Sequence, residues 1–180
     1  MASLNFDQNV SNEELYVSVG EVIGHEISHA FDQIGSLFDK DGNYNSNGWW
    51  TAEDYVAFKE KNNKLIEYLN TQIHPWEGLQ MNGELMAGEV CADMGGRKVM
   101  LMMASQRPDF DYDLFIRSYA SHMLYEYNEK YLDLYMNDEH PQAYIRVNLT
   151  LQQYDEFLDF YGITEGDGMY LAPKDRIAIW

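Results

Sequence analysis

The sequence predicts a mainly α-helical chain, and two kinds of observation support this. Two helix-start signals place a hydroxyl residue three positions before an acidic one: Ser11 with Glu14, and Thr51 with Asp54. Apolar residues also recur at helical spacing, as between residues 15 and 31. No repeat, low-complexity tract or linker interrupts the 180 residues, so we expect residues 1–180 to form one domain.

Six helices are expected in chain order. Their approximate ranges are 12–31, 51–70, 85–106, 112–136, a short helix opened by Pro141, and 150–161, which ends at Gly162. The stretch 74–78 should break the second helix. Gly88, Gly95 and Gly96 destabilise the third, so we expect it to pack closely against another helix. The apolar C-terminal stretch should pack against the rest of the chain.

Residues 37–50 read as a turn-rich loop. Asp39, Asp41 and Gly42 do not fall at EF-hand spacing, so the two aspartates are interpreted as turn residues and not as calcium ligands.

The charge balance excludes several function classes. Acidic residues outnumber basic ones by 30 to 12, for a formal charge of −18, which argues against binding nucleic acid or anionic membrane surfaces. No apolar run reaches membrane-spanning length, and the first residues show no signal peptide, which leaves the cytoplasm and a bacterial cell surface both open. Cys91 is the single cysteine, so an internal disulfide is excluded.

The stretch GEVIGHEISHAFDQIG carries the clearest chemical signal. His25 and His29 stand four positions apart, on one face of a helix, where they can bind one zinc ion. Glu26 lies about 100° further round the helix, beside the metal, where it can take a proton from metal-bound water. Two solvated histidines are the alternative, but the apolar neighbours predict a buried helix, where unpaired histidines are unfavourable.

A catalytic zinc needs a third protein ligand. The extended pattern HExxHxxGxxH is excluded, because residues 32 and 35 are Asp32 and Gly35. Asp32 itself is one candidate. Glu89 is the stronger one, because Glu89 and Asp93 again lie four apart on a predicted helix, with Asp93 placed to accept a hydrogen bond from a ligand imidazole.

The motifs VIGHEISHAFD and GEVCADMGG together resemble the neprilysin (M13) family of zinc endopeptidases, in particular its bacterial endopeptidase O branch. Glu89 follows His29 by 60 positions, as in that family, and GWW at 48–50 and the final DRIAIW fit as well. The resemblance runs from about Val22 to the last residue. It implies the helical part of a zincin-type (gluzincin) catalytic domain.

The resemblance also implies roles for individual residues. His25, His29 and Glu89 match the ligands of one zinc ion, and Glu26 matches the general base. Four further residues match the family pattern: Asp93 as the group that orients a ligand histidine or donates a proton, Asp32 as an acid beside His29, His140 as the oxyanion stabiliser, and Arg146 as the group that binds the substrate backbone. His140 and Arg146 rest on this resemblance alone.

The chain departs from the family pattern in length. Family members carry a helical N-terminal region over the active site and a strand that pairs with the substrate, and both precede the zinc helix. We therefore expect the C-terminal portion of a peptidase that acts on small peptides. The alternative is a zinc-binding domain with little activity of its own, partnered by an N-terminal part of the same peptidase or by a second copy.

Overall fold

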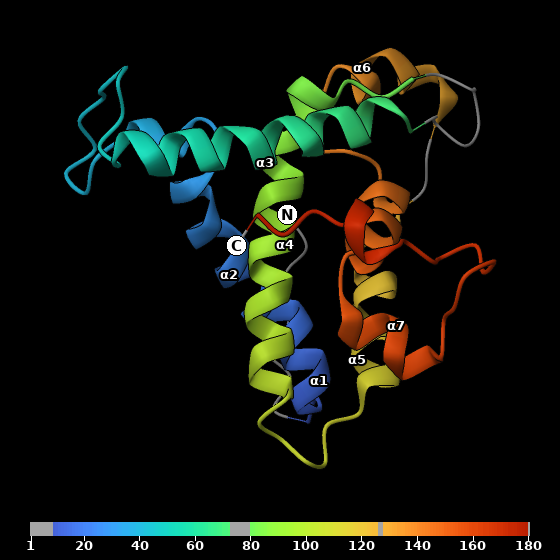
Figure 1. The fold of residues 1–180 in the computed structure, drawn as a ribbon. Coiled ribbons are helices and arrows are strands. Elements are labelled where there is room, and N and C mark those ends of the chain that lie inside the picture. The colour runs from blue at the N-terminus through green and yellow to red at the C-terminus, as the bar shows by residue number, and fades with distance from the viewer. Residues whose placement is uncertain (1–8, 73–79, 126–127, 180) are drawn as a thin grey trace.

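The computed structural model describes residues 9–72, 80–125 and 128–179, which are mostly helical (Figure 1). The chain opens with one unbroken helical run: α1 (Asn12–Leu15), the π-helical η1 (Tyr16–Glu21), α2 (Val22–Ser28) and the 3-10 turn η2 (His29–Phe31). Ser11 begins this run as predicted. Its hydroxyl accepts a hydrogen bond from the Glu14 backbone N–H, and the Glu14 carboxylate accepts one from the Ser11 N–H.

The mainly α-helical fold is confirmed by the elements that follow. They are the 3-10 turn η3 (Gly35–Leu37), α3 (Ala52–Asn70), α4 (Gly83–Ala104), α5 (Tyr112–His122), η4 (Glu129–Tyr131), α6 (Leu132–Met136), the π-helical η5 (Ile145–Leu149), α7 (Asp155–Tyr161) and η6 (Pro173–Asp175). Thr51 caps α3 as predicted. The left-handed Gly162 ends α7, also as predicted. Asp39 accepts hydrogen bonds from the backbone of Asp41 and Asn43, as a turn residue does.

Helix α4 is the centre of the structure (Figure 1). Its first half packs with α3 and the C-terminal tail, around the buried residues Leu65, Met86 and Ile177. Its second half packs with η1, α5 and α7, around Leu101 and Phe115. Because both cores share α4, residues on that helix are held from both sides.

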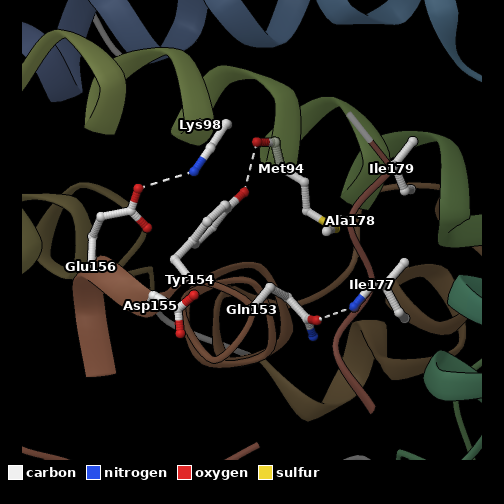
Figure 2. A pocket seen from close by; sticks show the side chains of 9 residues that line it. All are labelled: Met94, Lys98, Gln153, Tyr154, Asp155, Glu156, Ile177, Ala178 and Ile179. Atoms are coloured by element: carbon white, nitrogen blue, oxygen red, sulfur yellow. Dashed lines mark hydrogen bonds and ion pairs between the residues drawn. The ribbon is translucent and has the colours of Figure 1, made fainter. Parts of the chain in front are cut away.

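The C-terminal tail packs against the rest of the chain, as predicted, and its partner there is α4. A cavity of about 220 Å³ remains between parts of the two, and most of the polar groups that line it are paired with one another (Figure 2). Lys98 pairs with Glu156, the Tyr154 hydroxyl donates to the Met94 carbonyl, and the Ile177 N–H donates to Gln153. Because these lining groups already bond to one another, we interpret the cavity as a packing feature of the tail.

Two predicted helices are interrupted. The predicted helix 112–136 is wrong as one element: α5 ends at His122, and Asn128 starts a new turn by accepting a hydrogen bond from the Lys130 N–H. The predicted helix 150–161 begins only at Asp155, because Tyr154 is extended. The predicted break at 74–78 lies outside the described residues.

The predicted burial of the histidine-bearing helix is also wrong for this chain. None of the residues of α2 is buried, and the side chains of Ile23 and Ile27 are 54% and 61% exposed. One side of α2 packs on α4, while Val22, Ile23 and Ile27 face solvent. We call these three residues the apolar face of α2.

Candidate active site

Helices α2 and α4 cross in close contact at two glycines. A Cβ atom on Gly24 would lie 2.8 Å from the Cα of Gly96, and a Cβ on Gly96 would lie 2.7 Å from the Glu21 carbonyl oxygen. Side chains at these positions would push the helices apart. The close packing predicted from the glycines of the third helix is therefore confirmed at Gly96.

The crossing brings the three predicted metal ligands together. The Nε2 atoms of His25 and His29 are 3.1 Å apart. Glu89 reaches both: its Oε2 lies 3.4 Å from His25 Nε2, and its Oε1 lies 3.3 Å from His29 Nε2. Two helices thus present two nitrogens and one carboxylate at a single point, which is a donor set that zinc accepts.

A carboxylate lies behind each imidazole. Asp93 Oδ1 is 2.9 Å from His25 Nδ1, and Asp32 Oδ2 is 2.8 Å from His29 Nδ1. Asp32 is itself fixed, because its Oδ1 accepts hydrogen bonds from the backbone N–H groups of Ile34 and Gly35. Asp32 therefore supports His29 from behind and does not join the ligand cluster.

These contacts make the site suitable for a cation. The Asp32 carboxylate can only accept, so Nδ1 of His29 carries the proton in that hydrogen bond. With a cation bound at the shared point, Nε2 of each histidine would direct a lone pair toward it. The buried Oε2 of Glu89 also lacks a hydrogen-bond partner among the described residues. Two imidazole nitrogens and a carboxylate this close together are stabilised by a positive charge between them, which can be a bound cation or, in the metal-free chain, the proton on His25.

In the metal-free chain, a proton on His25 supplies the positive charge. Burial disfavours the charged form of His25, but Asp93 and Glu89 outweigh it and raise its pKa to about 9. Burial opposes ionisation of Glu89 and Asp93 too. The surrounding cations, His25 for Glu89 and Arg146 for Asp93, still hold the pKa of each carboxyl below its ordinary value. The carboxyls are therefore negatively charged at neutral pH, as a metal site requires.

The remaining predicted residues surround the cluster. Glu26 is exposed on α2, next to His25. Arg146 donates hydrogen bonds from Nε and Nη2 to the two oxygens of Asp93, at 2.8 and 2.5 Å. His140 is half-exposed; its Nδ1 contacts Asp138, and its Nε2 lies 3.4 Å from Glu89 Oε2.

A cavity of about 370 Å³ opens beside His29, between the loop after η2 and the start of α4. Leu85, Gly88 and Glu139 line it together with Asp32 and Glu89. Glu139 also lies near Glu89 and His140, and these three form a second set of side chains close enough together to hold a metal ion. Sequence reasoning did not single out Glu139, because an exposed acidic residue in an acidic chain carries no distinguishing signal.

A buried ion pair next to the site was also missed. Arg97 and Glu21 pair one helical turn from Asp93 and His25, respectively. The available signal was the spacing: each residue stands four positions from a site residue, within an apolar stretch.

Comparison with known proteins identifies the family. The model of peptidase family M13 matches residues 2–177. The chain belongs to this family. The resemblance to neprilysin-type peptidases is thereby confirmed.

Relatives of this M13 chain are much longer than it is. The neutral endopeptidase of Lactococcus lactis subsp. cremoris is 36% identical over 174 residues, which cover 94% of this chain and 27% of the relative. Among solved structures, PepO from Lactobacillus rhamnosis superposes with a TM-score of 0.89 at 30% identity, over 100% of this chain and 28% of PepO. Mycobacterium tuberculosis zinc metalloprotease Zmp1, bound to an inhibitor, superposes with a TM-score of 0.88 at 26% identity, over 97% and 29% of the chains.

The M13 chain thus spans about a quarter of the length of these relatives. Across the described residues, the structure contains no helix with both the length and the apolar character needed to cross a membrane.

Proposed function

We propose that this chain carries the catalytic centre of a zinc-dependent endopeptidase that hydrolyses peptide bonds of small peptides. The strongest support is the meeting of His25 Nε2, His29 Nε2 and the Glu89 carboxylate between two helices, with a carboxylate behind each imidazole. One zinc ion per chain would be held by these three residues. The zinc metalloprotease Zmp1, whose fold this chain shares, supports the choice of metal.

The chain's own residues divide the remaining work. A bound zinc ion would supply Lewis acidity, which polarises a carbonyl and acidifies a water molecule. Glu26 stands exposed beside the ligands, where it accepts the proton of the attacking water and passes it to the leaving amine. Asp93 holds the His25 ring in the orientation that keeps Nε2 free.

His140 and Arg146 are the proposed contacts to the substrate. The His140 imidazole is half-exposed at the edge of the cluster, where it can stabilise a developing oxyanion. Arg146 donates two N–H groups to Asp93, and the other N–H groups of its guanidinium can donate to a substrate carbonyl. Asp93 would thus position one ligand and one substrate-binding residue at once.

A second candidate function is a zinc-binding domain with little peptidase activity of its own. The solvent-exposed apolar face of α2 favours it, because Val22, Ile23 and Ile27 lie beside the ligand histidines and stay exposed among the residues that the structure describes. An N-terminal part of the same peptidase, or a second copy of the chain, would cover this face. Under this proposal the metal site is complete, and the substrate-binding surface is not.

Metal analysis combined with a peptidase assay tests both candidates. Purified chain is expected to hold one zinc equivalent, and His29→Ala to lose it, while His122→Ala, at the far end of α5, keeps it. Undiminished zinc in His29→Ala would refute the ligand assignment. Turnover of a short peptide then distinguishes an active peptidase from a zinc-binding domain.

A further inference from the structure

Two ion pairs join α4 to the helical run of residues 12–31, and they lie one helical turn apart. Asp93 on α4 faces His25 on α2, and Arg97, one turn later on α4, faces Glu21, one turn before His25. The glycine contact between Gly24 and Gly96 lies between the two pairs along each helix. The first pair belongs to the proposed metal site, whereas the second is fully inside the protein.

Arg97 is enclosed on all sides. Its side chain is 0% exposed, and its guanidinium donates from Nε and Nη2 to Glu21 Oε1, at 2.8 and 2.6 Å. The guanidinium carbon lies 3.3 Å from the centre of the Tyr119 ring. Nη1 donates to the Thr150 hydroxyl oxygen at 3.2 Å. Arg97 therefore holds three elements at once: η1, α5 and the segment that follows η5.

Two residues that contact Arg97, Tyr119 and Thr150, also contact Arg146. The Tyr119 hydroxyl donates to the Arg146 carbonyl oxygen at 3.1 Å, and the Thr150 hydroxyl donates to the same oxygen. The side chain of Arg146 donates two hydrogen bonds to Asp93, and Asp93 forms an ion pair with His25. A continuous path of hydrogen bonds, one ring contact and the ion pair between Asp93 and His25 thus runs from Arg97 to the proposed metal site.

We propose that Arg97 is a positioning residue for the metal site, acting through Tyr119 and Thr150 on Arg146, and through Arg146 on Asp93 and His25. This proposal rests on the function proposed above. Arg97 contacts none of the last three residues directly. Its role is to fix the backbone from which Arg146 reaches Asp93, while Glu21 anchors Arg97 to the helical run that carries His25.

Glu21 fits this anchoring role. Its side chain is 5% exposed, and its Oε2 has no hydrogen-bond partner among the described residues. Burying a carboxylate with one unpaired oxygen is unfavourable, and an ion pair is often no more stable than well-packed apolar residues in its place. The pair fixes the direction of both side chains beside the proposed site, which fits an anchoring role.

Metal affinity of the purified chain is the first readout. Zinc dissociation constants are measured by competition with a chromophoric chelator in wild type, Arg97→Met, Arg97→Lys and Glu21→Gln. Tyr154→Phe is the control, because it removes a buried hydrogen bond to the Met94 carbonyl in the same core and leaves the hydrogen bonds among Arg97, Thr150, Tyr119 and Arg146 in place. Arg97→Met should weaken binding roughly three- to tenfold, somewhat less than loss of a group bonded directly to a ligand.

Arg97→Lys should weaken binding less than Arg97→Met, because lysine keeps the charge but loses the planar fork. Tyr154→Phe should lower the thermal midpoint and leave the affinity within about twofold of wild type. Wild-type affinity in a folded Arg97→Met, or an equal loss in Tyr154→Phe, would overturn the proposal. If Arg97→Met does not fold, Arg97→Lys and Glu21→Gln are judged by the same criterion.

A double-mutant cycle tests whether the effect passes through Asp93. Arg97→Met combined with Asp93→Asn should bind zinc no more weakly than Asp93→Asn alone, because the path is already cut. Full additivity of the two losses would mean that Arg97 acts by another route.

A metal-free measurement separates this proposal from the zinc assignment. Exchange of the Arg146 Nε–H with solvent, followed by NMR, should be at least about tenfold faster in Arg97→Met and unchanged in Tyr154→Phe. Unchanged exchange in Arg97→Met would refute the positioning role even if zinc binds as proposed. Faster exchange in a chain whose zinc does not depend on His29 would keep the effect of Arg97 on Arg146 and refute the metal site.

Discussion

Gly24 and Gly96 meet where α2 crosses α4, so closely that a Cβ atom on Gly24 would stand 2.8 Å from the Cα of Gly96. This contact sets the distance between the histidine pair on one helix and Glu89 on the other. The geometry of the proposed metal site therefore depends on two residues without side chains, neither of which has a role in the proposed chemistry.

Gly96→Ala should destabilise the chain and weaken its metal affinity together. The added methyl would lie 2.8 Å from the His25 backbone nitrogen and 2.7 Å from the Glu21 carbonyl oxygen, so the helices must shift. We expect a loss of about 1–3 kcal/mol in the free energy of unfolding. Gly168→Ala is the control, since nothing lies within 4 Å of its added Cβ. Equal stability of the two variants, measured in denaturant, would contradict this packing.

Glu26→Gln should separate metal binding from catalysis. The glutamine keeps size and hydrogen-bonding capacity but cannot take a proton at neutral pH. We expect one zinc equivalent to remain, and peptidase activity, in this chain or in a longer form that contains it, to fall about 100- to 10,000-fold. Metal content and kcat/KM are measured on the same preparation. Activity near wild type would show that another group activates the water.

The stability of the metal-free chain should depend on pH through His25. Its pKa rises from 6.5 to about 9: burial opposes the charge, but Asp93 and Glu89 favour it more strongly. A pKa raised by folding contributes stability that is complete below the unfolded value and is lost as pH rises through the folded value. The stability advantage of wild type over His25→Gln, measured in excess chelator, should shrink between pH 6.5 and about 9. A constant advantage across this window would be inconsistent with the ion pairs.

The exposed apolar face of α2 leads to a prediction about substrate turnover. We expect the chain to bind zinc but to hydrolyse short peptides poorly by itself. An extended peptide is normally held by hydrogen bonds to an edge strand, and the described residues contain helices and no named strand. Correct orientation of reactants is worth about 7–11 kcal/mol in favourable cases. The test compares kcat/KM for one peptide between this chain and a form extended upstream. Comparable values would show that these 180 residues suffice as a peptidase.

Local signals predicted most of the helices and the composition of the site. The caps at Ser11 and Thr51 act within one turn of chain, and the prediction of helices beginning there is confirmed. The spacing of His25 and His29 determines that they share a face, because four residues make about one helical turn. Helix interruptions were harder to predict: Asn128 and Tyr154 break runs whose apolar pattern continues.

The sequence by itself determined which residues we propose for the chemistry, because residue type and helical spacing are local properties. Only the tertiary structure decided how they meet. The crossing at Gly24 and Gly96 brings Glu89 to a histidine pair 60 positions away in the chain. The pairing of Arg97 with Glu21, and the exposure of the apolar face of α2, likewise depend on which helices pack together. A pattern along one helix shows that a face is apolar but does not show what covers it.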